Sequence, residues 1–258
     1  HGQTLFHDEK TKISIQLFDK NLNLNMAIPV ICNFRKNDLL NGGFGAPIIP
    51  IYHQLIHQKL NKKCSVFVNI GGVTNITIIN QEGIFAGDTS FGNALVNDLI
   101  KKKFNFEMDE DGYISGQGLV NESIIDLILS DPFFSRSLPK TLDRNYFHKY
   151  LEQLQAMDKT ENIINSLLEI VPISIEKLIF DTDPTIILCG GGRKNLTLQK
   201  LFRQHFKDVH SIDEYGLDGD YIESQGMALL SIRYLMRKKS TFTSTTGVKR
   251  EVYLGERC

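Results

Sequence analysis

The chain has 258 residues, of which 41% are hydrophobic and 23% are charged, as in an ordinary folded protein. Its 29 basic and 30 acidic residues nearly cancel, and the longest run of like charge is the three lysines at 101–103, so no nucleic acid partner is indicated. No apolar stretch reaches the ~18 residues that a membrane span needs, which excludes an integral membrane protein. The length suggests one large domain, or one full domain and part of another.

The four cysteines, Cys32, Cys64, Cys189 and Cys258, are scattered and have no zinc-site spacing. Three of them lie in or beside apolar runs. We therefore expect reduced, buried thiols and a cytoplasmic protein.

Strand-like and helix-like segments alternate along the chain, which predicts an α/β fold. In the first half, the pattern predicts a half-buried strand over 13–18, a short apolar run over 28–33, a helix over 51–60, strands over 65–70, 73–79 and 84–86, and a helix over 94–103. Gly71 and Gly72 separate two of these strands as a hairpin turn. Three antiparallel strands in meander order are expected here.

The second half is mostly helical by its spacing. It predicts helices over 121–129, 146–157 and 161–180, a buried strand over 185–189, and helices over 196–206 and 221–238. Pro172 is expected to break or kink its helix. Asp218 or Asp220 is placed to cap the last one.

Gly190, Gly191 and Gly192 stand between the buried strand at 185–189 and a helix. Glycine tolerates positive φ and lets a ligand approach the backbone, while a helix start offers free N–H donors to an anion. This layout is typical of an anion-binding turn, although a structural strand-to-helix turn explains it equally well.

Asp88 opens a polar segment, 88–93, which we expect to be a turn between a strand and a helix. Its carboxylate either caps the helix or is presented at the end of the strand as a general base. The residues alone favour the cap. Asn69 and Asn75, which flank the Gly71–Gly72 turn, place amide groups beside its exposed backbone.

Two further charged residues have plausible partners. The planar fork of Arg35 suits a carboxylate or phosphate, although a surface arginine is the simpler interpretation. Glu223 lies early in the last helix, where the helix dipole favours an acid. His53 and His57 share a helix face but lack the glutamate of the metalloprotease motif, so no metal site is expected.

Several of these segments form an ordered series. They are HGQT at 1–4, NFR at 33–35, GGFGAP at 42–47, NIGGVTNIT at 69–77, GDTSFGN at 87–93, CGGG at 189–192, DEYG at 213–216 followed by Glu223, TG at 246–247 and LG at 254–255. This series resembles, in the same order and over the whole chain, the motifs of the anhydro-N-acetylmuramic acid kinase family.

The resemblance implies an actin/hexokinase-like two-lobed kinase with ribonuclease H-like lobes. The family's opening phosphate loop is not found in these residues, so the first lobe is expected to be incomplete. Residues 1–63 would be its remnant, and residues 64–258 the second lobe with the nucleotide loop and the C-terminal helix.

The resemblance also implies a function. The family uses ATP and Mg²⁺ to open the 1,6-anhydro ring of anhydro-N-acetylmuramic acid with water and to phosphorylate the 6-hydroxyl, in cytoplasmic peptidoglycan recycling. An inactive remnant that binds a sugar or a partner, or a kinase of another small sugar, are the alternatives. The sequence does not decide the oligomeric state, and a homodimer is compatible with it.

By position in the family's motifs, Asp88 would be the catalytic base. The sugar-binding residues would be His1, Gln3, Arg35 and Glu223. The nucleotide-binding residues would be Gly71, Gly72, Asn75, Gly190, Gly191, Gly192 and Asn195.

Overall fold

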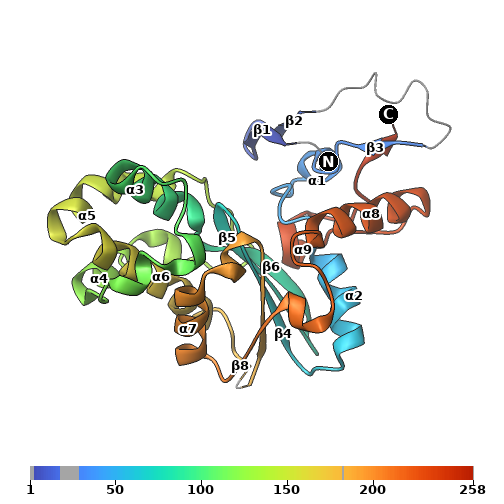
Figure 1. Ribbon diagram of the computed structural model, residues 1–258. Helices are drawn as coiled ribbons and strands as arrows, with labels where there is room; N and C mark the ends of the chain where they lie inside the picture. Colours follow the sequence, from blue (N-terminus) through green and yellow to red (C-terminus); the bar gives the residue numbers. More distant parts are fainter. Residues whose placement is uncertain (1–2, 18–28, 182, 258) are drawn as a thin grey trace.

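A five-stranded sheet organises the molecule in the computed structural model, which describes residues 3–17, 29–181 and 183–257 (Figure 1). The strand order is β6-β5-β4-β7-β8. The strands are β4 (Ser65–Ile70), β5 (Val73–Asn80), β6 (Gly83–Phe91), β7 (Thr185–Cys189) and β8 (Asp208–Ser211). The first three form the predicted meander, because β5 pairs antiparallel with both β4 and β6.

The remaining pairs in the sheet are parallel: β4 with β7, and β7 with β8. With β5 as the one antiparallel strand, this order is the topology of a ribonuclease H-like lobe. The predicted α/β fold class is therefore confirmed. Because β4 and β7 run in the same direction, their carboxyl ends, Ile70 and Cys189, lie at the same edge of the sheet.

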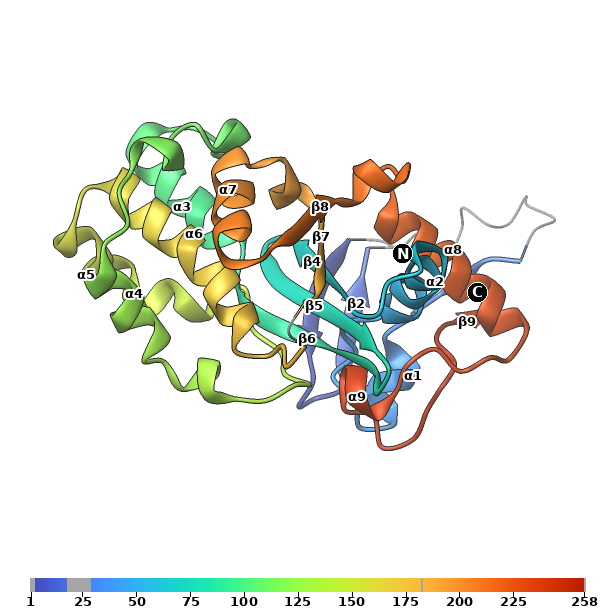
Figure 2. The ribbon, with the colours of Figure 1, turned by 90° about the horizontal axis from the view of Figure 1, so that it is seen from below.

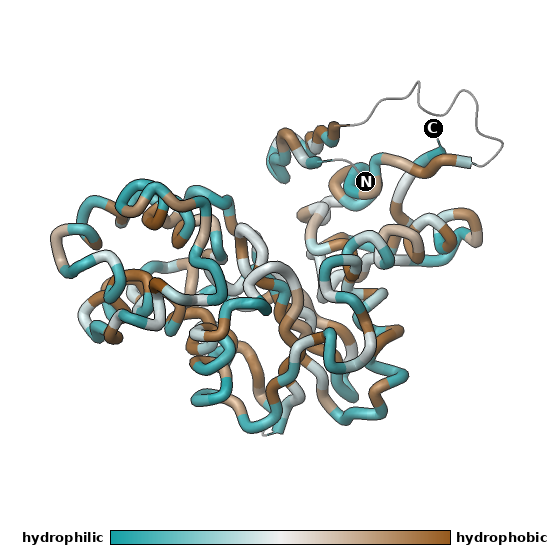
Figure 3. Tube along the Cα trace, viewed as in Figure 1, coloured by the Kyte–Doolittle hydropathy of each residue, from teal (hydrophilic) through white to brown (hydrophobic). Residues whose placement is uncertain are grey.

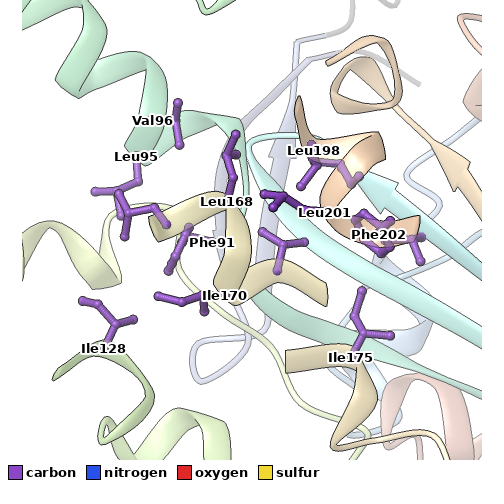
Figure 4. Packing of buried hydrophobic residues seen from close by; sticks show 14 of the residues in the cluster. Phe91, Leu95, Val96, Ile128, Leu168, Ile170, Ile175, Leu198, Leu201 and Phe202 are labelled. Atoms are coloured by element: carbon purple, nitrogen blue, oxygen red, sulfur yellow. The ribbon is translucent and has the colours of Figure 1, made fainter. Parts of the chain in front are cut away.

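Helices cover one face of the sheet as α3 (Asn93–Phe104), α4 (Glu122–Leu129), α5 (Leu151–Met157), α6 (Thr160–Glu176) and α7 (Leu196–His205). Leu168, Ile170 and Phe202 are almost fully buried in the core between them and the sheet (Figure 4). Short 3₁₀ turns join these helices and the strands at Glu110–Gly112, Ser115–Gln117, Pro132–Ser135, Tyr146–Tyr150, Gly191–Lys194 and Ile212–Tyr215.

The opposite face is covered by α2 (Pro50–Leu60) and α8 (Ile222–Leu235), with α9 (Thr243–Thr246) nearby (Figure 2). Its core joins Ile51 and Ile56 of α2 to Phe67 of the sheet and Leu230 of α8. The predicted division between 63 and 64 falls between α2 and β4, and residues on both sides of it share this core.

Beyond that core, β3 (Ile31–Cys32) pairs with β9 (Glu256–Arg257), and α1 (Lys36–Leu40) follows β3. A separate antiparallel hairpin contains β1 (Thr4–Asp8) and β2 (Ile13–Gln16). The hairpin contains hydrophobic residues (Figure 3). They remain exposed, at 59% for Leu5 and 50% for Ile15. The predicted strand at 13–18 is thus found as far as Gln16, but its apolar side chains do not face a core.

Two predictions of secondary structure were wrong, and one strand was missed. β6 runs to Phe91, so Asp88 lies within a strand and not in a turn, and Gly92 takes the N-cap position of α3. The polar residues Thr89 and Ser90 fit this buried strand because their hydroxyl groups donate to main-chain carbonyls. The predicted break at Pro172 was wrong, because helix α6 continues through this residue and ends at Glu176. The strand β8 was not predicted.

The predicted cap of the last helix was also wrong, because Tyr221 takes the N-cap position of α8 without a side-chain cap. Asp218 accepts from the N–H of Asp220, and Asp220 pairs with Arg193 and Lys194. These interactions use both carboxylates before the helix begins.

The thiols of Cys64 and Cys189 are free and buried, as predicted. Cys32 is disulfide-bonded, so the prediction of reduced thiols was wrong there. Cys32 lies on β3, whose pairing with the distant β9 is not visible in the sequence. Among the described residues, no helix is long and apolar enough to cross a membrane.

Candidate active site

Two glycine turns meet at the edge of the sheet where β4 and β7 end. Gly190 has φ +72°, and a Cβ added to it would lie 2.5 Å from Oδ1 of Asn69. A Cβ on Gly192 would lie 2.3 Å from Cγ2 of Ile70. Only glycine therefore fits where the second turn crosses the end of β4, and the two turns form one interlocked unit.

The Gly190→Ala variant tests this unit. It combines a positive φ with contacts far inside van der Waals distance, so we expect the free energy of unfolding to fall by roughly 2–4 kcal/mol. Gly216→Ala is the matched control, because Gly216 has φ +74° and open space where the Cβ would stand. That control should cost only about 1 kcal/mol. Urea unfolding of both variants makes the comparison, and equal losses would show that the close packing is unimportant.

The glycine turns line a pocket of about 220 Å³. Its wall contains Ile49, His53, Asn69, Gly71, Cys189, Gly190, Gly191, Gly219, Asp220, Ile222 and Glu223. Glu223 lies in the first turn of α8, so this helix start and both turns face one space. Burial lowers the pKa of His53 to about 3, so its ring is neutral near pH 7.

The side chain of Arg193 holds the second glycine turn, at 190–192, in place. Its side chain is 4% exposed and forms ion pairs with Asp213 (Nε–Oδ2, 2.7 Å) and Asp220 (Nη1–Oδ1, 2.8 Å). Nη1 also donates to the carbonyl oxygen of Gly190 at 3.0 Å. One buried guanidinium thus ties the turn to the loop that carries the two acids.

Asp88 and Arg35 form a second group of charges in the site. Oδ2 of Asp88 accepts from the N–H of Leu142 at 2.7 Å. Burial raises the pKa of Asp88 to about 7, although this N–H and the cations of Arg35 and Lys140 act in the opposite direction. A carboxyl group whose pKa lies near neutral pH suits the role of a general base.

The guanidinium of Arg35 is held against the loop at 42–47. Nη1 donates to the carbonyl oxygen of Gly45 at 2.8 Å, and Nε is buried without a partner among the described residues. Burial lowers the pKa of Arg35, while the charges of Glu223, Asp88 and Asp38 raise it. Arg35 therefore interacts electrostatically both with Glu223, which lines the pocket, and with Asp88.

The structure brings together part of the predicted site. Gly71, Gly190, Gly191 and Glu223 line one pocket, and Arg35 interacts electrostatically with both Glu223 and Asp88. Gly72 completes the first turn, the buried Gly192 continues the second, and Asn75 lies opposite Asp88 in the ladder of β5 and β6.

Other predicted residues lie elsewhere. Asn195 is 9% exposed, and its Oδ1 caps α7 by accepting from the N–H of Leu198, so it does not line the pocket. Gln3 has an exposed side chain, and its carbonyl oxygen accepts from the N–H of Leu17. His1 lies outside the described residues.

The sequence interpretation missed three supporting groups. Asp38 is fully buried, where it accepts from the N–H of Gly45 and the hydroxyl of Thr246. Lys140 is 2% exposed, and the N–H of Leu142 binds Asp88. A lysine in the largely polar segment 135–144 gives no signal of this kind, and a main-chain donor gives none at all.

A magnesium ion is implied by the resemblance, and the pocket offers partial ligation for it. In the described ranges, no three His, Cys, Asp or Glu residues are grouped so that they could hold a metal. Asp220 and Glu223 nevertheless line the pocket, and since both carboxylate oxygens of Asp220 are paired with Arg193 and Lys194, the Glu223 carboxylate is the donor that an ion would meet. Magnesium in kinases is commonly held by one or two carboxylates together with substrate phosphates and water, so the donor set fits an ion that arrives with a nucleotide.

Comparison with known proteins decides the family. A family model described as anhydro-N-acetylmuramic acid kinase matches residues 1–257. The chain belongs to the anhydro-N-acetylmuramic acid kinase family. The kinase of this name from Pelagibacter ubique is 37% identical over 97% of this chain and 70% of its own length, and that from Gluconobacter oxydans is 33% identical over 99% and 73%.

Among solved structures, this member of the anhydro-N-acetylmuramic acid kinase family is similar to the activator of the 2-hydroxyisocaproyl-CoA dehydratase from Clostridium difficile with bound ADPNP. The TM-score is 0.42 at 14% identity, over 67% of this chain and 61% of the other. The ethanolamine utilization protein EutJ from Carboxydothermus hydrogenoformans gives a TM-score of 0.34 at 13% identity, over 60% and 46%.

Proposed function

We propose that this chain carries out the reaction after which its family is named, on anhydro-N-acetylmuramic acid with ATP. The observation that carries the proposal is the buried carboxyl group of Asp88, which is held by the N–H of Leu142 and interacts with Arg35, a neighbour of the glycine-lined pocket through Glu223. A general base and a backbone-lined pocket for the nucleotide phosphates are the two parts that such a reaction needs.

In this proposal Asp88 removes a proton from water, and the water oxygen bonds to the anomeric carbon of the sugar. The bond from that carbon to O6 breaks, and its electron pair stays on O6. O6 then attacks the γ-phosphorus of ATP, and ADP leaves with the electron pair of the broken phosphoanhydride bond. The proton held by Asp88 passes to solvent, so the products are the 6-phosphorylated open sugar, ADP and one proton.

The nucleotide phosphates would lie against Gly71, Gly190 and Gly191, which line the pocket and leave the backbone accessible. Magnesium, when bound, would neutralise the charge that develops on the transferred phosphoryl group. Arg35, whose Nε has no partner in the part of the chain that the structure describes, would donate to the sugar, and Glu223 would face the sugar from α8. The sugar-binding site would be completed by His1 and Gln3. The nucleotide-binding site would be supported by Gly72, Gly192, Asn75 and Asn195. The reaction would take place in the cytoplasm.

The test is to supply the purified chain with ATP, Mg²⁺ and anhydro-N-acetylmuramic acid and to identify the product by mass spectrometry. The proposal predicts a mass gain of one water and one phosphoryl group. In H₂¹⁸O, the label should enter the anomeric hydroxyl. Calorimetric binding of the sugar without turnover would instead support the inactive remnant, and turnover of other sugars only would support a kinase of different specificity.

A further inference from the structure

The segment 138–142 packs against Asp88 through its backbone. The N–H of Asp88 donates to the carbonyl oxygen of Lys140 at 2.8 Å, and the N–H of Leu142 donates to Oδ2 of Asp88 at 2.7 Å. A Cβ on Gly87 would lie 2.9 Å from both the nitrogen and the oxygen of Lys140, so β6 and this segment are in direct contact.

These bonds orient the carboxylate. Among the described residues, the N–H of Leu142 is the one group that donates to it, and it binds Oδ2. Oδ1 is therefore left to accept a proton from a ligand or from water. The segment is itself held from the other side, because the hydroxyl of Thr141 donates to Oε2 of Glu9 at 2.7 Å.

Lys140 adds a charge to this support. It is 2% exposed, and its Nζ lies 4.4 Å from the centre of the Phe133 ring and 3.2 Å from the carbonyl oxygen of Phe133. No carboxylate within the described ranges forms an ion pair with it. A buried ammonium without a carboxylate partner is costly, and the acidic group whose charge reaches it is Asp88.

We propose that Lys140 is a positioning residue for Asp88. The ammonium group of Lys140 favours the ionised form of the Asp88 carboxylate, and the backbone at 140–142 orients this carboxylate. The inference rests on the proposed function only in taking Asp88 as the base. The other charged groups that face Asp88 are Arg35 and Glu9, and Arg136 faces Lys140. Of these, Glu9 opposes ionisation of Asp88 and Arg35 favours it.

The test compares two variants that lack the charge, Lys140→Met and Lys140→Gln. The glutamine keeps a donor for the carbonyl oxygen of Phe133, so it remains informative if the methionine variant does not fold. Lys140→Arg keeps the charge. The matched control is Arg136→Met, which removes an exposed cation 5.7 Å from the same Phe133 ring. The cations that act on the pKa of Asp88 are Arg35 and Lys140.

The readout is the titration of Asp88 by ¹³C NMR of protein labelled at aspartate, with the signal assigned by its loss in Asp88→Asn. We expect the midpoint to move up by at least about 0.5 pH unit without the charge and to stay near the wild-type value in Lys140→Arg and Arg136→Met. If turnover is observed, its pH profile should move by the same amount. An unchanged Asp88 midpoint in a folded Lys140→Gln protein would overturn the inference, whether or not the chain is a kinase. A shifted midpoint without turnover would support the inference and count against the proposed function.

Discussion

The Asp88→Asn variant is expected to lose at least about 10²-fold in turnover and, at pH 8, to be more stable than the wild type. The loss follows from the proposed role of Asp88, because an amide cannot accept a proton from water. The gain follows from its surroundings. Burial raises the pKa of this carboxyl from 3.8 to about 7, which means that the folded protein disfavours its ionised form.

The sign of the stability effect depends on pH. Between pH 4 and 7 the folded chain binds a proton at Asp88 that the unfolded chain has released, so this group's contribution to stability falls as pH rises through that window. Well above pH 7 the full cost applies and is on the order of 4 kcal/mol for a shift of this size. An asparagine avoids the ionisation cost but still needs hydrogen bonds. We therefore expect a net gain of roughly 1–2 kcal/mol at pH 8 and little or none at pH 4.

Chemical unfolding of both proteins at pH 4 and pH 8, alongside the product assay, measures both effects. Asp98→Asn is a suitable control, since the Asp98 side chain is 43% exposed and pairs with His148 at the surface of α3. It should change neither turnover nor the pH dependence of stability by much. An Asp88→Asn protein that is less stable than the wild type at pH 8 would show that the carboxylate is well accommodated, contrary to the high pKa.

The sequence predicted the elements of the sheet better than the position of Asp88 within it. Glycine turns are visible because they depend on local conformation, and Gly71 and Gly190 lie where the pattern placed them. The segment around Asp88 has the polarity of a turn, yet it is the end of a strand. Its buried hydroxyl groups donate to main-chain carbonyls, including that of Thr74 on the neighbouring strand. These hydrogen bonds offset the cost of burying the hydroxyl groups, but they form only in the folded chain and leave no periodic pattern in the sequence.

The ion pairs and charge interactions that support the site could not be predicted from the sequence for a similar reason. Arg193 is 20 residues from Asp213 and 27 from Asp220 along the chain. Arg35, at the start of α1, interacts electrostatically with Glu223 in the first turn of α8, which lies near the other end of the chain. Resemblance to a family gave roles to single positions. It could not show which side chains hold those positions in place.

Among these supporting residues, Arg193 is the one whose substitution should destabilise the fold most. We expect Arg193→Met to lower the free energy of unfolding by about 2–4 kcal/mol, because two carboxylates and the carbonyl oxygen of Gly190 lose a buried donor. Asp213 and Asp220 are about half exposed and can be hydrated, which keeps the loss below that of a fully buried pair. The Gly190 turn would no longer be fixed, so affinity for ATP should fall at least about 10-fold.

Lys194→Met is the matched control for this experiment, because Lys194 pairs with the same Asp220 carboxylate but its side chain is 57% exposed. An exposed ion pair contributes only about 0–1 kcal/mol. The difference between the variants should also depend on pH. The Arg193 guanidinium lowers the pKa of Asp213, so this stabilisation is present above the ordinary value of 3.8 and is lost as the pH falls further. Urea unfolding at pH 7 and pH 3, with ATP affinity by calorimetry, makes the comparison. If Arg193→Met is no less stable than Lys194→Met at pH 7, the nucleotide turn is held by its glycine packing alone.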